Sequence, residues 1–281
     1  MKVILSRKGF DSDKTTGGGP SPILPEGDLL SLPIKDNRDN TLYKELLFNG
    51  NTYLSILQQL GYPWAYDEKV SCHLDPDIRP DCIKREKDWK PSLGQIDAAQ
   101  KHLMNNGVKE GDLFLFFGWF APTERYQGVL RYVPGGKNGM HVMFGYLQVG
   151  EILRMNKPRE VPDWLKPHPH TSEIRFDTDG RGRNNTIYVA RNNLTFAQDL
   201  PGAGYFPKYS DSLRLTKAFC QKRTHWELPD FLREARITYH SDPWKDGYFK
   251  SACRGQEFVI HHSDPDLLAE WVTSIIRKNI R

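Results

Sequence analysis

The apolar residues fall into short runs separated by long polar stretches. The first run, Val3-Ile4-Leu5, predicts a buried strand near the first residue. Residues 112–120 are almost continuously apolar, which is typical of a strand buried on both faces. A glycine-rich turn separates this run from a second strand predicted over 141–153, so we expect an antiparallel pair. Further strands are predicted over 186–190 and 257–260.

Helical spacing of apolar residues occurs in three places. The pattern predicts helices over 52–60, 95–105 and 267–280, and the last of these has one apolar side. Strands and helices in this order favour an α+β fold with a mixed, mainly antiparallel sheet and flanking helices. Neither an internal repeat nor a linker is visible, so we expect one α+β domain over residues 1–281.

Composition narrows the class of protein without naming a function. Hydrophobic residues make up 38% and aromatic residues 12% of the chain, so it is not disordered by composition. No apolar run approaches the roughly 20 residues of a membrane helix. The net charge of +4 is too mild to indicate a nucleic-acid partner. The four cysteines form no CxxC pair and no signal peptide is visible, so we expect reduced thiols in a cytoplasmic protein.

The segment 61–93 is long, irregular and rich in Asp, Pro and Trp. It contains His73, Asp75 and Asp77 at alternate positions, so their side chains would point the same way on an extended backbone. Such a set could hold a divalent metal such as Mg²⁺ or Mn²⁺, or supply a general acid and base. The alternative is a turn in which Pro76 and capping carboxylates have only a structural role.

Polar residues also lie at the ends of two predicted strands. Arg7, with Asp11 after it, follows the first strand and could meet a phosphate or carboxylate. Arg254, Gln256 and Glu257 open the strand at 257–260, where a carboxylate needs a partner or a function. Arg7 and Glu257 are similar to the arrangement of ADP-ribosyltransferases, which would imply NAD; the alternative is an Arg–Glu pair that holds the end of the sheet.

Two further groups have weaker signals. His168 and His170 flank a proline in a polar loop, where histidines are usually surface residues; the alternative is that they are ligands. The strands within 108–191 resemble the rhythm of PUA-like barrels, which bind a flipped or modified base. In that case Trp119 would stack on the base, while Phe114, Phe116 and Phe117 would be core.

Longer motifs indicate a family. The segments ILSRKGFDS, GGGPSPILPEG, HLDPDIRP, GQIDAAQKHL, GDLFLFFGWF, HVMFGYLQVGEI, NNTIYVA, LPGAGYF and RGQEFV resemble the nucleotide-modification-associated domain family of the third type. The resemblance covers nearly the whole chain and implies a bacterial or phage protein that serves in the modification of bases in nucleic acid, without giving a mechanism. The residues that it places in the motif blocks are Arg7, Asp11, Asp75, Asp77, Trp119, His141, Glu151 and Glu257.

Three classes of function follow. The leading hypothesis is an enzyme that modifies a nucleobase or nucleotide, with a nucleic acid or nucleotide as partner and no membrane. The alternatives are a PUA-like module that binds a modified base without turnover, and an NAD-dependent ADP-ribosyltransferase-like enzyme. A divalent metal and NAD are both possible cofactors. The candidate catalytic residues are His73, Asp75, Asp77 and Glu257, and the candidate substrate-binding residues are Arg7, Asp11, Trp119, His141, Arg254 and Gln256.

Overall fold

A ten-stranded mixed sheet forms the centre of the molecule. The structure is a computed structural model that describes residues 1–11, 13, 15–253 and 255–280. The sheet runs in the order β14-β17-β1-β8-β10-β11-β7, with β2 and β9 paired to β8 and β12 paired to β10. Its strands are β1 (Val3–Arg7), β2 (Ser21–Ile23), β7 (Ser92–Gln95), β8 (Leu113–Tyr126), β9 (Val129–Tyr132), β10 (Met140–Arg154), β11 (Thr186–Ala190), β12 (Ala203–Tyr205), β14 (Arg236–Ile237) and β17 (Glu257–His261).

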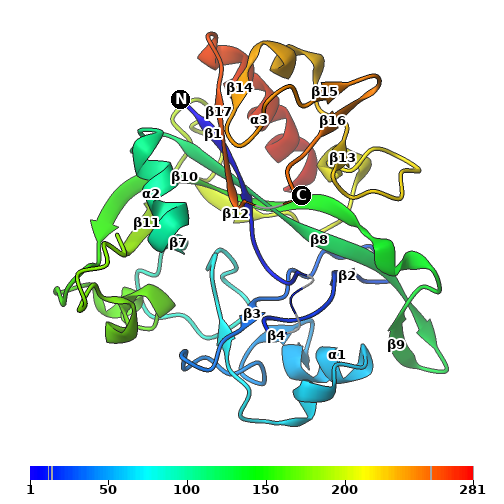
Figure 1. Cartoon of the computed structure of the whole chain (residues 1–281). Helices are drawn as coiled ribbons and strands as arrows, with labels where there is room; N and C mark the ends of the chain where they lie inside the picture. Colours follow the sequence, from blue (N-terminus) through cyan, green and yellow to red (C-terminus); the bar gives the residue numbers. More distant parts are fainter. Residues whose placement is uncertain (12, 14, 254, 281) are drawn as a thin grey trace.

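Smaller elements surround this sheet (Figure 1). The short strands are β3 (Ile34–Lys35) with β6 (Cys72–His73), β4 (Leu47–Phe48) with β5 (Asn51–Thr52), and β13 (His225–Trp226), β16 (Tyr248–Lys250) and β15 (Trp244–Lys245). The α-helices are α1 (Tyr53–Gln59), α2 (Asp97–Asn105) and α3 (Pro265–Asn279). The 3₁₀ helices cover Pro63–Tyr66, Gly136–Asn138, Asp163–Leu165, Pro169–Thr171, Glu173–Arg175, Asp211–Leu213 and Asp230–Glu234.

The predicted α+β class is confirmed, as is the antiparallel pairing of the two long strands, β8 and β10. The strands within 108–191 lie inside the large sheet, which has β14 and β7 at its edges. Among the described residues this sheet stays open, so the possible PUA-like barrel is not formed.

Strand β1 joins the two ends of the chain. It pairs parallel with β8 and antiparallel with β17, so Ser6 lies opposite both Phe116 and Glu257. Val3, Ile4 and Leu5 are fully buried, as expected for a strand with neighbours on both sides. Helix α3 packs beside these strands (Figure 1), with Asp264 as its N-cap and Pro265 in its first turn.

A second hydrophobic cluster lies around α1, below the sheet in the view of Figure 1. Trp64 contacts the rings of Phe10, Tyr43 and Tyr62 there, with ring centroids 5.4–6.0 Å apart. Tyr62 and Trp64, at the start of segment 61–93, are therefore packed against this cluster, which holds the beginning of the irregular segment in place.

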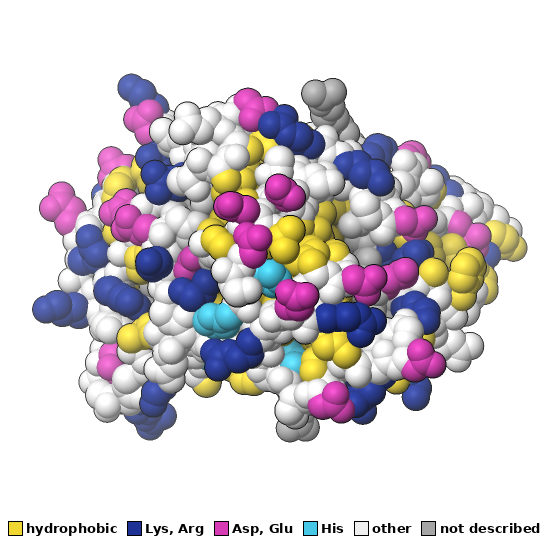
Figure 2. Space-filling model, turned by 90° about the horizontal axis from the view of Figure 1, so that it is seen from above, with side chains coloured by type: hydrophobic (Ala, Val, Ile, Leu, Met, Phe, Trp, Pro, Cys, Tyr) yellow, Lys and Arg dark blue, Asp and Glu magenta, His cyan; other side chains and the backbone are white. Residues whose placement is uncertain are grey.

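Charged side chains of both signs are mixed over the face of the molecule in Figure 2. This mixing agrees with 39 basic and 35 acidic residues in the whole chain. Among the described helices, none is long and apolar enough to cross a membrane.

We expect the variant Phe117→Ala to lose about 3–5 kcal/mol of the free energy of unfolding, because a large buried ring leaves a cavity. Phe117 is fully buried between Trp226, His141 and Phe258. Urea unfolding followed by tryptophan fluorescence measures the change. The control is Phe219→Ala, whose side chain is exposed and should change the free energy by less than about 0.5 kcal/mol. Equal effects of the two substitutions would contradict the core assignment.

Candidate functional site

A polar cleft opens at the end of the sheet where β1 and β7 end and β17 begins. Its volume is about 1260 Å³, including space open to solvent. Segments far apart in the sequence meet in it. The lining residues are Arg7, Lys8, Gly9, Asp11, Asp13, Thr16, Ile34, Asp36, Arg38, His73, Asp75, Gly94, Gln95, Ile96, Asp97, His170, Arg175, Arg183 and Gln256.

His73 is held in the cleft by the buried carboxylate of Asp39. It ends β6, and its Nδ1 lies 2.7 Å from Oδ2 of Asp39. Arg175 holds the same carboxylate, with Nη1 at 2.7 Å from Oδ1 and Nη2 at 2.9 Å from Oδ2. An ionised carboxylate only accepts hydrogen bonds, so Nδ1 of His73 is the donor to Asp39, and in the neutral ring Nε2 carries the lone pair. Nη2 of Arg175, which donates to the same carboxylate, lies 3.2 Å from this Nδ1. Arg175 and His73 therefore share Asp39 as an acceptor.

Asp75 is the buried carboxylate of the cleft. Its Oδ1 accepts a 2.6 Å hydrogen bond from the amide of Gly94 on β7, and Nε2 of His168 lies 3.5 Å from the same oxygen. Its Oδ2 lies 3.9 Å from Nε2 of His73. Burial by itself would raise the pKa of Asp75, but the contact with His168 and the positive charge of Lys8 outweigh it. The pKa is held well below its usual range, so Asp75 is ionised at neutral pH.

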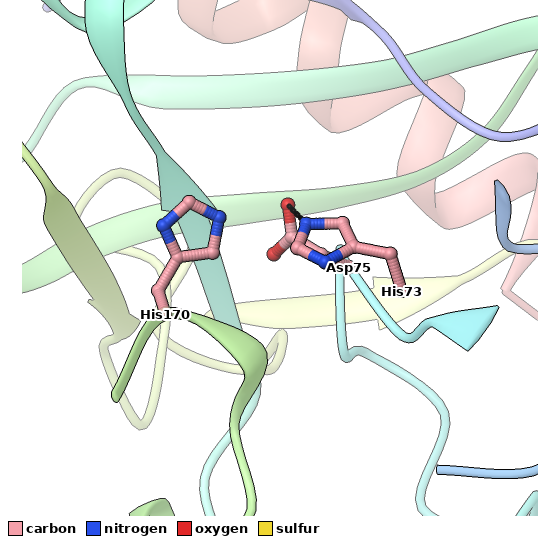
Figure 3. A group of neighbouring side chains, drawn as sticks. All are labelled: His73, Asp75 and His170. Carbon is pink, nitrogen blue, oxygen red and sulfur yellow. Dashed lines mark ion pairs between the residues drawn. The ribbon is translucent and has the colours of Figure 1, made fainter. Parts of the chain in front are cut away.

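His170 approaches Asp75 from the opposite side to His73 (Figure 3). Its Nδ1 lies 2.6 Å from Oδ1 of Asn185, the residue before β11. Its ring lies directly over Gly94: a β-carbon there would be 2.1 Å from Cδ2 of His170. Burial lowers the pKa of His170 well below its usual value, so the imidazole is neutral.

His73, Asp75 and His170 together form what we term the histidine–aspartate cluster. One donor atom from each lies within 4.8 Å of the others. A second set, Asp36, Asp39 and His73, meets the same distance limit. However, Asp36 is engaged by Arg38 and Asp39 by Arg175, so the first set is better suited to an exogenous ligand.

Glu257 lies behind the wall of the cleft and is 1% exposed. Its Oε1 accepts hydrogen bonds from Ser6 Oγ at 3.0 Å and from Gln95 Nε2 at 2.6 Å. The ammonium group of Lys8 lies 3.2 Å from the same oxygen. The charge partner observed for Glu257 is thus Lys8, and Glu257 fixes two lining residues, Lys8 and Gln95.

The other candidates at the strand ends also line the cleft. The amide of Arg7 donates to the carbonyl of Gln256 at 2.7 Å, and its Nη1 donates to the carbonyl of Cys253 at 3.3 Å. Asp11 accepts a 2.7 Å hydrogen bond from the amide of Asp13. Arg254 lies outside the described residues.

Three predicted site residues lie away from this cleft. Asp77 is held by Arg85 through contacts of 2.6 and 2.8 Å, and it also accepts from Trp89 Nε1 at 3.1 Å. The Nε1 of Trp119 donates to the carbonyl of Asn138. His141 is in the core, where it accepts a 3.0 Å hydrogen bond from Trp226 Nε1, and burial lowers its pKa to about 3.

Trp119 and Glu151 also have surroundings of their own. The guanidinium of Arg223 lies 3.8 Å from the centre of the Trp119 ring. Glu151 lies on β10 and lines a separate hollow beside β11. The described structure therefore brings together Arg7, Asp11, His73, Asp75 and Gln256, with Glu257 just behind them.

Sequence reasoning missed Asp39 and Arg175, and the expectation that His168 and His170 are surface residues is wrong, because they are 6% and 2% exposed. The spacing of His168 and His170 around Pro169 is the local feature of the sequence that could have indicated this part of the site. In the structure the carbonyl of Pro169 accepts a hydrogen bond from Arg175, and Nδ1 of His168 accepts one from the amide of His170. Asp39 and Arg175 are 136 positions apart in the chain, so no local pattern reveals their pairing.

The comparison with protein families agrees with the motif pattern. Residues 2–261 match the family described as nucleotide modification associated domain 3. The chain belongs to this family. No curated protein and no solved structure matches it. The histidine–aspartate cluster and the lining of the cleft lie within the matched residues, so they are part of the family domain.

We expect Asp39→Asn to lower the free energy of unfolding by about 3 kcal/mol, because it removes the carboxylate nearest the buried guanidinium of Arg175 and leaves that of Asp36, 3.3 Å away, to compensate the charge. Chemical denaturation at neutral pH measures the loss. The matched control is Asp199→Asn, which breaks the exposed pair with Arg277 and should cost less than about 1 kcal/mol. A loss for Asp39→Asn no larger than that of the control would show that this ion pair does not stabilise the fold.

Proposed function

We propose that this protein is an enzyme that modifies a nucleobase or nucleotide bound in the polar cleft. The observation that carries the proposal is the convergence of Arg7, Asp11, His73, Asp75 and Gln256 from distant segments within the family domain. The family description supplies the class of substrate, and the cleft supplies both cationic and proton-accepting groups.

The cationic groups of the cleft differ in availability. Arg38 and Arg175 are already engaged with carboxylates. Arg7 donates to the carbonyl of Cys253, and Arg183 donates to the carbonyl of Ile174. A neutral carbonyl does not compensate a guanidinium charge, so Arg7 and Arg183 are the lining residues best suited to bind the phosphate of a nucleotide.

The histidine–aspartate cluster supplies the reactive end. Nε2 of His73 carries a lone pair, and the Asp39 carboxylate supports the opposite side of the ring. Asp75 is ionised, and the imidazole of His170 is neutral. Groups of this kind accept a proton or ligate a metal ion, and either property supports a reaction at this end of the cleft.

The alternative functions fit the cleft less well. A module that reads a base needs an accessible stacking surface, but Trp119 does not line the cleft and Arg223 covers its ring. An ADP-ribosyltransferase-like site needs its glutamate to contact the ribose, whereas Glu257 is 1% exposed and already accepts from Ser6 and Gln95. These observations favour the modification enzyme.

We expect Arg7→Gln to weaken nucleotide binding by about tenfold or more, because it removes a cation available to the phosphate. Isothermal titration with nucleoside monophosphates, triphosphates and a short single-stranded oligonucleotide measures the affinity. The control is Arg277→Gln, which removes the same charge from an exposed position on α3. Unchanged affinity in Arg7→Gln would place the phosphate elsewhere.

We expect Asp75→Asn to abolish the modification, because it removes the buried charge of the histidine–aspartate cluster with little change in shape. Nucleosides are prepared from the DNA and nucleotide pools of cells that express each variant, and compared by mass spectrometry. A new nucleoside mass should be present with the wild-type protein and with Asp81→Asn, an exposed position in the same segment. The same new mass in cells with Asp75→Asn would contradict the assigned role.

A further inference from the structure

Three hydrogen-bond acceptors face one another in the histidine–aspartate cluster, and no hydrogen-bond donor between them is apparent among the described residues. The assignment of protons follows from the partners on the far side of each ring. Nδ1 of His73 donates to Asp39, so Nε2 is unprotonated in the neutral ring. This leaves a lone pair aimed at Oδ2 of Asp75, 3.9 Å away.

The same argument applies to His170. Asn185 donates through its Nδ2 to the carbonyls of Met155 at 3.2 Å and His170 at 2.9 Å. Its Oδ1 is therefore the atom that faces the His170 ring at 2.6 Å, and Nδ1 of His170 must carry the hydrogen. Nε2 of His170 thus presents a second lone pair, from a side chain that is 2% exposed.

The third acceptor is Asp75. The amide of Gly94 donates a hydrogen bond to its Oδ1, and Nε2 of His168 lies 3.5 Å from the same oxygen. Nδ1 of His168 accepts from the amide of His170, so the His168 hydrogen is on Nε2, the atom next to Asp75. Oδ1 of Asp75 therefore already has partners, whereas Oδ2 faces the two histidines of the cluster and can bind a ligand between them.

Two lone pairs and a carboxylate oxygen within 4.8 Å of one another repel, and a cation bound between them would remove this repulsion. We propose that His73 Nε2, His170 Nε2 and Asp75 Oδ2 bind one divalent first-row transition-metal ion. Two imidazoles and one carboxylate form the donor set of non-haem iron sites with open positions, and imidazole suits Fe²⁺, Co²⁺ and Zn²⁺ better than Mg²⁺.

The supporting partners are those that metal ligands require. Each histidine donates its Nδ1 hydrogen to an oxygen, Asp39 for His73 and Asn185 for His170, which fixes the tautomer and the ring orientation. Ligands about 2.0–2.2 Å from one ion lie about 3.0–3.4 Å apart, so the cluster has to contract by about an ångström. Gly94 leaves room for the His170 ring at this place, because the β-carbon of any other residue would overlap it.

The three ligands lie on the wall of the cleft, so the remaining coordination positions face the space where the substrate is proposed to bind. One carboxylate leaves a divalent ion with a net positive charge, which would attract an anionic group of the substrate. A role of the metal ion in catalysis rests on the proposed function, whereas the binding of the metal ion by itself does not.

The test is a titration of the full-length protein with Co²⁺ after treatment with a chelator, without any nucleotide. We expect one Co²⁺ per chain, visible d–d absorption and competition by Zn²⁺ but not by millimolar Mg²⁺. His73→Gln and His170→Gln should each weaken Co²⁺ binding by more than about 100-fold. Asp39→Asn, which removes no ligand, should weaken it by about 10–100-fold. His262→Gln, in which the replaced histidine does not line the cleft, is the control and should bind as the wild-type protein does.

Absence of stoichiometric Co²⁺ binding in the wild-type protein would overturn the proposal, even if every variant failed to fold. Equal binding by His73→Gln or His170→Gln with a native circular dichroism spectrum would overturn it as well. The two proposals can be tested separately. If nucleotide binding depends on Arg7 but no Co²⁺ binds, the proposed function stands and the metal site is wrong. If Co²⁺ binds but no nucleotide does, the metal site stands and the proposed function is wrong.

Discussion

The pairing of β1 on both sides is the constraint on which the rest of the structure depends. This strand of five residues hydrogen-bonds to β8 in parallel and to β17 in antiparallel orientation. A slip of one residue would turn its buried side chains to the opposite face of the sheet, so its register is strongly specified. The amide of Lys8 donates to the carbonyl of Phe117 just beyond the strand, which extends the same register to the wall of the cleft. The position of the lining residues is thus set by strand pairing in the core.

Buried charges in the wall of the cleft are paired with opposite charges. The guanidinium of Arg175 neutralises the carboxylate of Asp39, and Asp39 orients the ring of His73. Lys8 and Glu257 form a similar buried pair at the ends of β1 and β17, with Nζ of Lys8 3.2 Å from Oε1 of Glu257. Asp39 and Glu257 each have a cationic group within about 3 Å, which favours the ionised form of such groups inside a protein. The groups left over after this pairing are those that face the solvent-filled space.

Most of the fold could be predicted from the sequence because the strands and helices have clear apolar periodicity. The long strand β8 extends to Tyr126, beyond the predicted end at residue 120, because β2 pairs with residues 120–122 and β9 pairs with the more polar residues 123–126. The site was only partly predictable. Alternate spacing identified His73 and Asp75, but Asp77 forms a bridge with Ser92 and its carboxylate contacts Arg85, so the shared direction fails at the third position. His170, Asp39 and Arg175 depend on pairings across the whole fold, which no local pattern encodes.

The histidine–aspartate cluster spans almost one hundred positions of the chain, and each member is fixed by a different element of the folded sheet. Asp75 is fixed by Gly94 on β7, and His170 by Asn185 at the start of β11. In the unfolded chain these groups are dispersed, so a ligand that needs all three binds the native state alone. Such a ligand raises the free energy of unfolding by mass action, by about 2.7 kcal/mol at a concentration one hundred times its dissociation constant. The melting temperature of the whole protein should therefore rise with the fraction of molecules whose cluster holds the ligand.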